Sequence, residues 1–369
     1  MADYNPDDLY REIANYEYHS IDDSVIAPIY SKIMEIPMMI IPKAISPNFI
    51  SLCGLFLVLV GMLFVETNPV ITGLTIVLYH MCDTLDGKQG RRLGMENNPT
   101  TELFDHGVDS IVSLTVSHNI SRLFDLDITI EVFIIVIVFS IFFISTCENS
   151  KTHLMHFKDP ALNPTEILLV VESIFILHPL YQPLISDNFI LCVGLVVCPY
   201  LIFKIINEFL LLIGNFDRPG ANSIIVVSAL CLLFPVNVMM CGLSNGQSIF
   251  SIIVGLNIII ICTIWIEISK FSFNFLLPFA ILLNLIIGVT YIPNFVLLLS
   301  MLVATGMTNI NFGKALLMSS LFGLVLYLDL TISFLLCAGY LIMFYEFNNI
   351  ICQVLGMDHF FSIPLIDSD

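Results

Sequence analysis

The chain has 369 residues, of which 57% are hydrophobic and 12% are charged. Soluble domains carry about 25% charged residues, so this composition indicates an integral membrane protein. The formal net charge of −18 excludes an ordinary nucleic-acid-binding protein, because such a protein needs a basic surface to displace counterions.

The first 48 residues precede the first long apolar run and are predicted to form a cytoplasmic N-terminal segment. Residues 1–23 are polar and acidic, which predicts an exposed tail rather than a cleaved leader. Residues 24–41 carry isoleucines at a spacing of three to four. This spacing predicts an amphipathic helix that either lies in the membrane interface or packs on its own protein. Ser46 or Asn48 is placed to cap the helix that follows. The spaced isoleucines are Ile26, Ile29, Ile33, Ile36 and Ile40.

Long apolar runs continue along the rest of the chain. A membrane-spanning helix needs roughly 17–25 such residues, and helices satisfy every backbone polar group within the bilayer. The runs do not alternate as the strands of a barrel do, so the sequence predicts an all-α, polytopic membrane fold with about ten transmembrane helices. The expected spans are Phe49–Val65, Val70–Cys82, a partly polar segment after Phe104, Ile128–Ser145, Thr165–Pro179, Phe189–Ile213, Ser223–Met240, Ile249–Ile268, one or two within Phe273–Val303, and Leu316–Tyr345.

Four aspartates interrupt this apolar pattern between the second and third spans. Asp83 and Asp86 are three residues apart, and Asp105 and Asp109 are four apart, so on helices each pair shares one face. Four carboxylates in one small volume repel each other strongly unless cations are bound. Ligands that are all oxygen select Mg²⁺, Mn²⁺ or Ca²⁺, and two such ions can clamp a diphosphate. The sequence therefore predicts a divalent metal site.

The residues between the two pairs suit a phosphate-bearing ligand. Gly87 and Gly90 allow a close approach to the backbone, and the three basic residues of Lys88–Arg92 can meet phosphate oxygens. His106 lies between the later aspartates and can carry a proton near neutral pH. The alternative is an ordinary solvated loop. The positive-inside rule favours a cytoplasmic loop at Lys88–Arg92, which holds the densest basic cluster.

On these residues the chain resembles the CDP-alcohol phosphotransferase family. It has the family's D-x2-D-G-x2 at Asp83–Gln89, an arginine at Arg91, and D-x3-D at Asp105–Asp109. The wording DGKQ-RR and ELFDHG-DS is similar to the eukaryotic choline and ethanolamine phosphotransferases. The segments YHSIDDSVIAPIYSKI, SPNFISLCG and NPTE, the last at Asn163–Glu166, resemble further parts of the family pattern.

The chain departs from the family pattern in three places. Gly90 replaces the usual alanine, and Thr101 stands where the family has a glycine. The spacer that follows Arg91 is one residue longer than usual. In the family that glycine lies against the bound nucleotide, so Thr101 could reshape the nucleotide pocket.

The resemblance implies a six-helix catalytic core over residues 49–215, further transmembrane helices over 216–345, and a tail over 346–369. It implies transfer of phosphocholine or phosphoethanolamine from CDP-choline or CDP-ethanolamine to diacylglycerol, with release of CMP. This reaction is the last step of phosphatidylcholine or phosphatidylethanolamine synthesis. It also implies an endoplasmic-reticulum or Golgi membrane, an active site facing the cytosol, and a homodimer.

The resemblance also implies roles for individual residues. His106 would be the base that accepts the diacylglycerol proton, with Asp109 as the alternative base. Glu166 would orient His106, although Asn163–Glu166 is also a good helix-capping sequence. Two Mg²⁺ or Mn²⁺ ions would be held by Asp83, Asp86, Asp105 and Asp109, and CDP would contact Asn48, Gly87, Gly90, Arg91 and Thr101.

Other readings of the aspartates remain open. An intramembrane prenyltransferase also pairs aspartate motifs around Mg²⁺, and a divalent-cation transporter would use the carboxylates as its ion path. A catalytically silent relative is the third alternative, since Thr101 and the longer spacer depart from the pattern. Glu172, within an expected span, is predicted to serve packing or interhelical bonding.

Overall fold

The computed structural model describes residues 6–152, 154–157, 163–184, several positions between 253 and 268, and 331–363. Within these ranges the chain is mostly helical, as predicted, apart from two three-residue strands that pair in parallel. The elements are α1 (Pro6–Ala14), β1 (Ser20–Asp22), α2 (Ala27–Ile33), α3 (Glu35–Met38), α4 (Pro47–Met62), α5 (Pro69–Arg92), α6 (Pro99–Leu123), α7 (Ile128–Thr152), β2 (Met155–Phe157), α8 (Pro164–Tyr181), the 3-10 helix η1 (Gln182–Leu184) and α15 (Thr331–Leu355).

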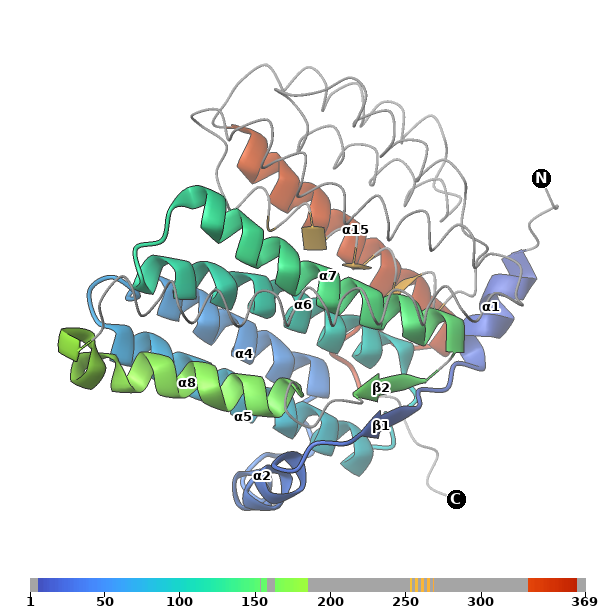
Figure 1. Ribbon diagram of the computed structural model, residues 1–369. Coiled ribbons are helices and arrows are strands. Elements are labelled where there is room, and N and C mark those ends of the chain that lie inside the picture. Colours follow the sequence, from blue (N-terminus) through green and yellow to red (C-terminus); the bar gives the residue numbers. More distant parts are fainter. Residues whose placement is uncertain are drawn as a thin grey trace.

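Helices α4 to α7 lie side by side, with α8 against α5 and α15 against α6 (Figure 1). Among the described residues, α8 has the length and apolar composition to cross a membrane, while Pro47–Met62 and Ile130–Thr146 are apolar but shorter. The number of about ten transmembrane helices stays a prediction. The predicted spans Phe189–Ile213, Ser223–Met240 and Phe273–Val303 lie outside the described residues, and Ile249–Ile268 and Leu316–Tyr345 lie partly outside them.

Most described side chains of residues 10–23 are exposed, as their polarity predicts, but the segment is docked on the rest of the protein. Ile13 and Tyr16 are buried, and α1 packs against α15. β1 pairs with β2, a strand more than 130 residues further along the chain. Two buried side chains and a backbone pairing are therefore enough to dock a polar segment, and the local sequence does not show these partners.

Residues 24–41 form two short helices, α2 and α3, instead of one. Pro37 lacks an N–H group, so a continuous helix would leave the Ile33 carbonyl without its partner. Met34 is buried and packs with Ile50 and Leu85. Ile29, Ile33, Ile36 and Ile40, in contrast, are 54–80% exposed. The segment therefore packs on its own protein through Met34 and presents an apolar face outward.

Proline and a polar cap begin the helices that carry the site. Ser46 is the N-cap of α4 and accepts a hydrogen bond from the Phe49 amide, which confirms one of the two predicted caps. Asn98 caps α6 by accepting from the Thr100 amide at 2.9 Å. A proline follows each cap, where its fixed φ suits the first helical position.

The charged residues after Cys82 are part of α5 rather than a loop, so the predicted loop at Lys88–Arg92 was wrong. Gln89 is buried and its amide donates to the carbonyls of Pro42 and Ile45 at 3.0 and 2.6 Å. This contact holds the last turn of the helix against the segment before α4. The helix ends at Arg92. Gly94 follows with a φ of 66°, which suits glycine, and the Met95 amide donates back to the Gly90 carbonyl.

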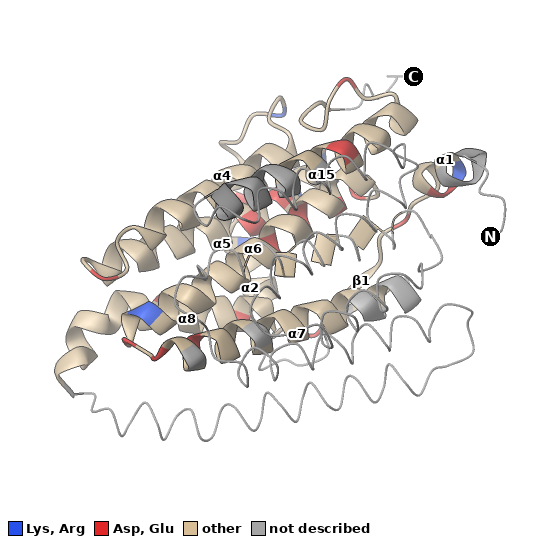
Figure 2. Ribbon diagram, turned by 90° about the horizontal axis from the view of Figure 1, so that it is seen from above, with Lys and Arg blue, Asp and Glu red and all other residues tan. Residues whose placement is uncertain are grey.

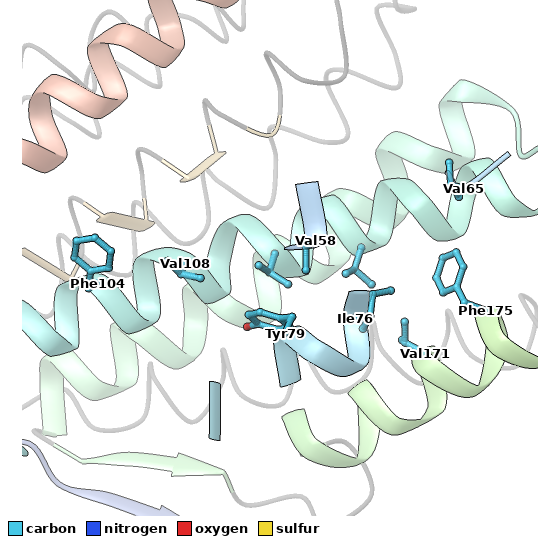
Figure 3. Packing of buried hydrophobic residues seen from close by; sticks show 10 residues of the cluster. Val58, Val65, Ile76, Tyr79, Phe104, Val108, Val171 and Phe175 are labelled. Atoms are coloured by element: carbon cyan, nitrogen blue, oxygen red, sulfur yellow. The ribbon is translucent and has the colours of Figure 1, made fainter. Parts of the chain in front are cut away.

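Helix α5 is held in place by a core between α4, α6 and α8. Figure 3 shows the side chains of this core, among them Val58, Tyr79, Phe104 and Phe175. Glycine at position 73 lets α5 and α8 approach closely, since a Cβ there would lie 2.8 Å from Ile176 Cγ1. The helix that carries the first aspartate pair is therefore packed on several sides.

A buried hydrogen bond joins α5 to α8. His80 Nδ1 lies 2.8 Å from Glu172 Oε1, and both residues are buried. The Tyr30 ring of α2 stacks on His80, with centroids 4.1 Å apart. The interhelical bonding predicted for Glu172 is confirmed.

Replacing Glu172 by leucine is expected to lower the free energy of unfolding by about 1–3 kcal/mol, because His80 would lose its buried partner. Thermal unfolding of the detergent-purified protein measures the change. Ser173→Ala, at an exposed hydroxyl of the same helix, is the matched control. Equal unfolding temperatures for the two variants would contradict the role given to this pair.

Candidate functional site

Two neighbouring helices bring the four aspartates together. Asp83 and Asp86 lie in α5, and Asp105 and Asp109 lie in α6. Asp83 interacts electrostatically with both aspartates of α6, and Asp86 does so with Asp109. Figure 2 shows acidic segments on α5 and α6 within the bundle. These electrostatic interactions show that the carboxylates of the two helices lie near one another.

This carboxylate cluster fits a divalent cation. Asp83 lies close enough to Asp109 and Asp105 to interact with them electrostatically, and charged carboxylates in that arrangement repel each other. Asp105, His106 and Asp109 each offer a ligand atom, and these atoms lie within 4.8 Å of one another. Carboxylate oxygens are the donors that Mg²⁺ and Mn²⁺ prefer, so the aspartates of this group suit these ions and the imidazole is left for another role. A bound cation would remove the repulsion.

Two hydroxyl groups fix the orientation of the aspartates. Tyr79 donates to Asp109 Oδ1 at 2.6 Å, and Ser51 of α4 donates to Asp86 Oδ2 at 2.5 Å. Sequence reasoning missed both residues. Tyr79 stands four residues, about one helical turn, before Asp83, so helical spacing alone places it on the face of α5 that carries the site. Ser51 lies on α4, and no local spacing in the sequence connects it to Asp86.

His106 lies between two carboxylates of its own helix. Its Nε2 is 2.9 Å from Glu102 Oε1, without the alignment of a hydrogen bond, and its Nδ1 is 3.8 Å from Asp109 Oδ2. His106 and Glu102 are both buried. The ring of Tyr18 is also near, with its centroid 5.9 Å from that of His106. Glu102 is a site residue that sequence reasoning missed, although it lies one helical turn before His106.

Glu166 does not orient His106 in this structure. Its Oε1 accepts hydrogen bonds from the Ser24 hydroxyl at 2.7 Å and from the amides of Val25 and Ile26 at 3.0 and 3.1 Å. Its Oε2 has no hydrogen-bond partner. Glu166 therefore binds the turn that precedes α2, while Asn163 caps its own helix, α8. The carboxylate beside His106 is Glu102 instead.

The residues expected to contact the nucleotide lie around the start of α4 and α6 and the end of α5. Asn48 is completely buried, and its Nδ2 lies 3.4 Å from Thr100 Oγ1. The buried Oδ1 of Asn48 and Oγ1 of Thr101 have no hydrogen-bond partner, so both could receive a ligand group. Arg91 lies over Gly87, where a Cβ would be 3.6 Å from the guanidinium Nη1.

Gly90 occupies a position that accepts the family's usual alanine. A Cβ at Gly90 would meet no atom nearer than Pro47 Cγ, at 4.0 Å. Gly90→Ala is therefore expected to raise the free energy of unfolding by about 0.5–1 kcal/mol, because alanine restricts the unfolded chain and favours the helix.

The same change elsewhere in α5 is the control. Gly73→Ala would bring a Cβ to within 2.9 Å of Phe175 Cβ and is expected to destabilise the protein by about 1–3 kcal/mol through overpacking. Thermal unfolding of both variants tests the pair. Shifts of the same sign would contradict the packing described for α5.

Comparisons with known proteins point to one family. A family model described as CDP-alcohol phosphatidyltransferase matches residues 44–200. An uncharacterised CDP-alcohol phosphatidyltransferase class-I family protein of Dictyostelium discoideum is 30% identical over 178 residues, covering 44% of each chain. Choline/ethanolaminephosphotransferase 1 of Saccharomyces cerevisiae is 26% identical over 198 residues, covering 49% of each. CDP-diacylglycerol–serine O-phosphatidyltransferase of Encephalitozoon cuniculi is 34% identical over 95 residues, covering 23% of this chain and 24% of its own. The matches thus span about half the length of the first two relatives and a quarter of the third.

Proposed function

Because residues 44–200 of this chain belong to the CDP-alcohol phosphatidyltransferase family, we propose that the protein transfers phosphocholine, phosphoethanolamine or both from their CDP carriers to diacylglycerol, releasing CMP. The observation that carries the proposal is the group Asp105, His106 and Asp109, whose ligand atoms lie within 4.8 Å of one another. Asp83 and Asp86 of the neighbouring helix α5 interact electrostatically with the aspartates of this group. The relative from Saccharomyces cerevisiae whose name includes both alcohols supports the choice of donors.

Asp83, Asp86, Asp105 and Asp109 would hold two Mg²⁺ or Mn²⁺ ions. When bound, such ions offset the negative charge of the diphosphate and of the departing CMP. Tyr79 and Ser51 would keep two of these carboxylates turned toward the site, because each donates a short hydrogen bond to one of their oxygens.

His106 would accept the proton of the diacylglycerol hydroxyl. Glu102 lies at Nε2 and would keep the proton on that nitrogen, which leaves Nδ1 as the acceptor. The negative charge of Glu102 would also stabilise the imidazolium that forms. Asp109 serves less well as the base, since one of its oxygens already accepts from Tyr79.

Asn48, Gly87, Gly90, Arg91 and Thr101 would contact the CDP part of the donor. Support comes from two buried oxygen atoms without partners, Asn48 Oδ1 and Thr101 Oγ1, at the start of the helices that carry the site. The guanidinium of Arg91 is exposed beside Gly87, where it can reach a phosphate oxygen.

The setting of the reaction is part of the proposal. The exposed isoleucines of α2 and α3 provide an apolar face that suits the membrane interface. We place the protein in an endoplasmic-reticulum or Golgi membrane, with the site facing the cytosol and the chain as a homodimer, as the resemblance implies.

A donor assay tests the proposal. Purified protein with Mn²⁺ and diacylglycerol is given CDP-choline or CDP-ethanolamine in parallel, and the lipid product and CMP are measured. Formation of phosphatidylcholine or phosphatidylethanolamine is the expected result. Parallel reactions with CDP-diacylglycerol plus serine, with a prenyl diphosphate, and with proteoliposomes for metal flux test the other functions. Turnover in one of these alone would contradict the proposal, and inactivity in all of them would indicate a catalytically silent relative.

A further inference from the structure

The chain turns back over the site after its last described helix. α15 ends at Leu355, and Gly356 follows with a φ of 65°, a conformation that favours glycine. The Met357 amide donates to the Cys352 carbonyl at 2.9 Å and closes the turn. We name residues 356–363 the C-terminal strap.

The strap packs on the connector between α5 and α6. Met357 is buried in a cluster with Leu93 and Met95 of the connector. The Asn98 side chain donates to the sulfur of Met357 at 3.4 Å. This connector belongs to the spacer that is one residue longer than in the family pattern, so the departure from the pattern coincides with the surface on which the strap lies.

The strap also occupies a hydrogen-bonding group of the proposed nucleotide site. The Phe360 carbonyl accepts from Asn48 Nδ2 at 2.5 Å. Asn48 is completely buried, so its amide protons need an acceptor whether or not a nucleotide is bound. The Phe360 carbonyl and a nucleotide oxygen would compete for the same donor.

Aromatic rings hold the strap against α6, the helix that carries Asp105 and Asp109. Phe104, which precedes Asp105, contacts the rings of Phe360 and Phe361, with centroids 5.6 and 5.5 Å apart. Phe361 also meets Phe49 edge to face at 6.2 Å. The two strap rings thus cover the start of α4 and of α6, where Asn48 and Thr101 lie.

We propose that the C-terminal strap is an autoinhibitory cover, which occupies the nucleotide site in the free protein and is displaced when a CDP-alcohol binds. This inference rests on the proposed function. Displacement of the strap is feasible because an acceptor group of the nucleotide would replace the Phe360 carbonyl as the hydrogen-bond partner of Asn48. Gly356 is a conformationally free residue about which the strap can rotate. A covered site lowers the apparent affinity for nucleotide by the fraction of molecules in which it is open.

Hydrogen–deuterium exchange of the unmodified protein tests the displacement. The amides of residues 357–363 are compared with Mn²⁺ alone and with Mn²⁺ plus CDP-choline, in the absence of diacylglycerol so that no turnover occurs. Faster exchange with the nucleotide is expected. Unchanged or slower exchange in a protein that binds the nucleotide would overturn the cover and leave the proposed function standing.

Nucleotide affinity tests the competition. Replacing Phe360 and Phe361 by alanine together is expected to tighten Mn²⁺-dependent CDP-choline binding about threefold or more, because the site is open more often. Asp358→Asn, at an exposed strap position, is the matched control, and thermal unfolding checks that both variants fold.

The outcomes of the affinity measurement separate the strap proposal from the proposed function. If the double variant bound CDP-choline as tightly as the parent protein, or less tightly, the strap proposal would be overturned and the proposed function would stand. Binding by the double variant but not by the parent would support the cover and overturn its displacement by the nucleotide. No Mn²⁺-dependent binding of either CDP-alcohol by either protein would contradict the proposed function and the strap proposal with it.

Discussion

Asp105→Asn is expected to lower CMP release by at least about 10²–10³-fold. The change keeps the shape of the side chain but removes one charge from the four carboxylates that would hold the metal ions. Asp105 interacts electrostatically with Asp86 and Asp109, so its loss affects both helices of the site. CMP release with Mn²⁺, diacylglycerol and each CDP-alcohol measures the effect.

The controls separate catalysis from folding. Glu96→Gln removes an exposed carboxylate from the connector between α5 and α6 and is expected to keep full turnover. In the absence of metal, Asp105→Asn removes repulsion within the cluster, so the variant should unfold at a higher temperature than the parent protein. Near-normal turnover by the folded Asp105→Asn variant would contradict the proposal that Asp105 holds a catalytic metal ion.

His106→Ala is expected to lower kcat by about 10²–10⁴-fold, the usual contribution of a positioned general base. The KM for the CDP-alcohol should change little, since His106 would act on the lipid hydroxyl. Glu102→Gln is expected to give a smaller loss in kcat, because the imidazole remains but loses the negative charge 2.9 Å from its Nε2. Steady-state kinetics of the two variants measure both effects.

His19→Ala is the matched control, because His19 is exposed and lies outside the site. If His106→Ala retained near-normal kcat, the base would be Asp109, the alternative that the sequence left open. If Glu102→Gln matched the parent protein while His106→Ala lost activity, Glu102 would have no part in positioning the histidine.

The aspartate site could be anticipated from sequence because its geometry is local. Asp83 and Asp86 share a face of one helix, Asp105 and Asp109 share a face of the next, and a short connector joins the two. Helical spacing alone therefore predicted that each pair would act as a unit. The same helical spacing places Glu102 one turn before His106 and Tyr79 one turn before Asp83, so both residues could have been predicted.

Contacts between distant parts of the chain could not be anticipated in this way. Glu166 bonds to Ser24, which is 142 residues away, and Asn48 bonds to Phe360, which is 312 residues away. The choice between such partners depends on how the helices pack, and no local pattern records it. The end of α5 was misjudged for a related reason, since the contacts of Gln89 with Pro42 and Ile45 stabilise a charged helical turn.

A metal titration of lipid synthesis tests the central claim most directly. Purified protein is depleted of divalent ions by a chelator and supplied with diacylglycerol and CDP-choline or CDP-ethanolamine, and CMP and the phospholipid are followed as Mn²⁺ or Mg²⁺ is added. The proposed site predicts no product without metal, and equal amounts of CMP and phospholipid once metal is restored. Phospholipid formation that continues in the chelator, or no product from either donor at any metal concentration, would contradict it.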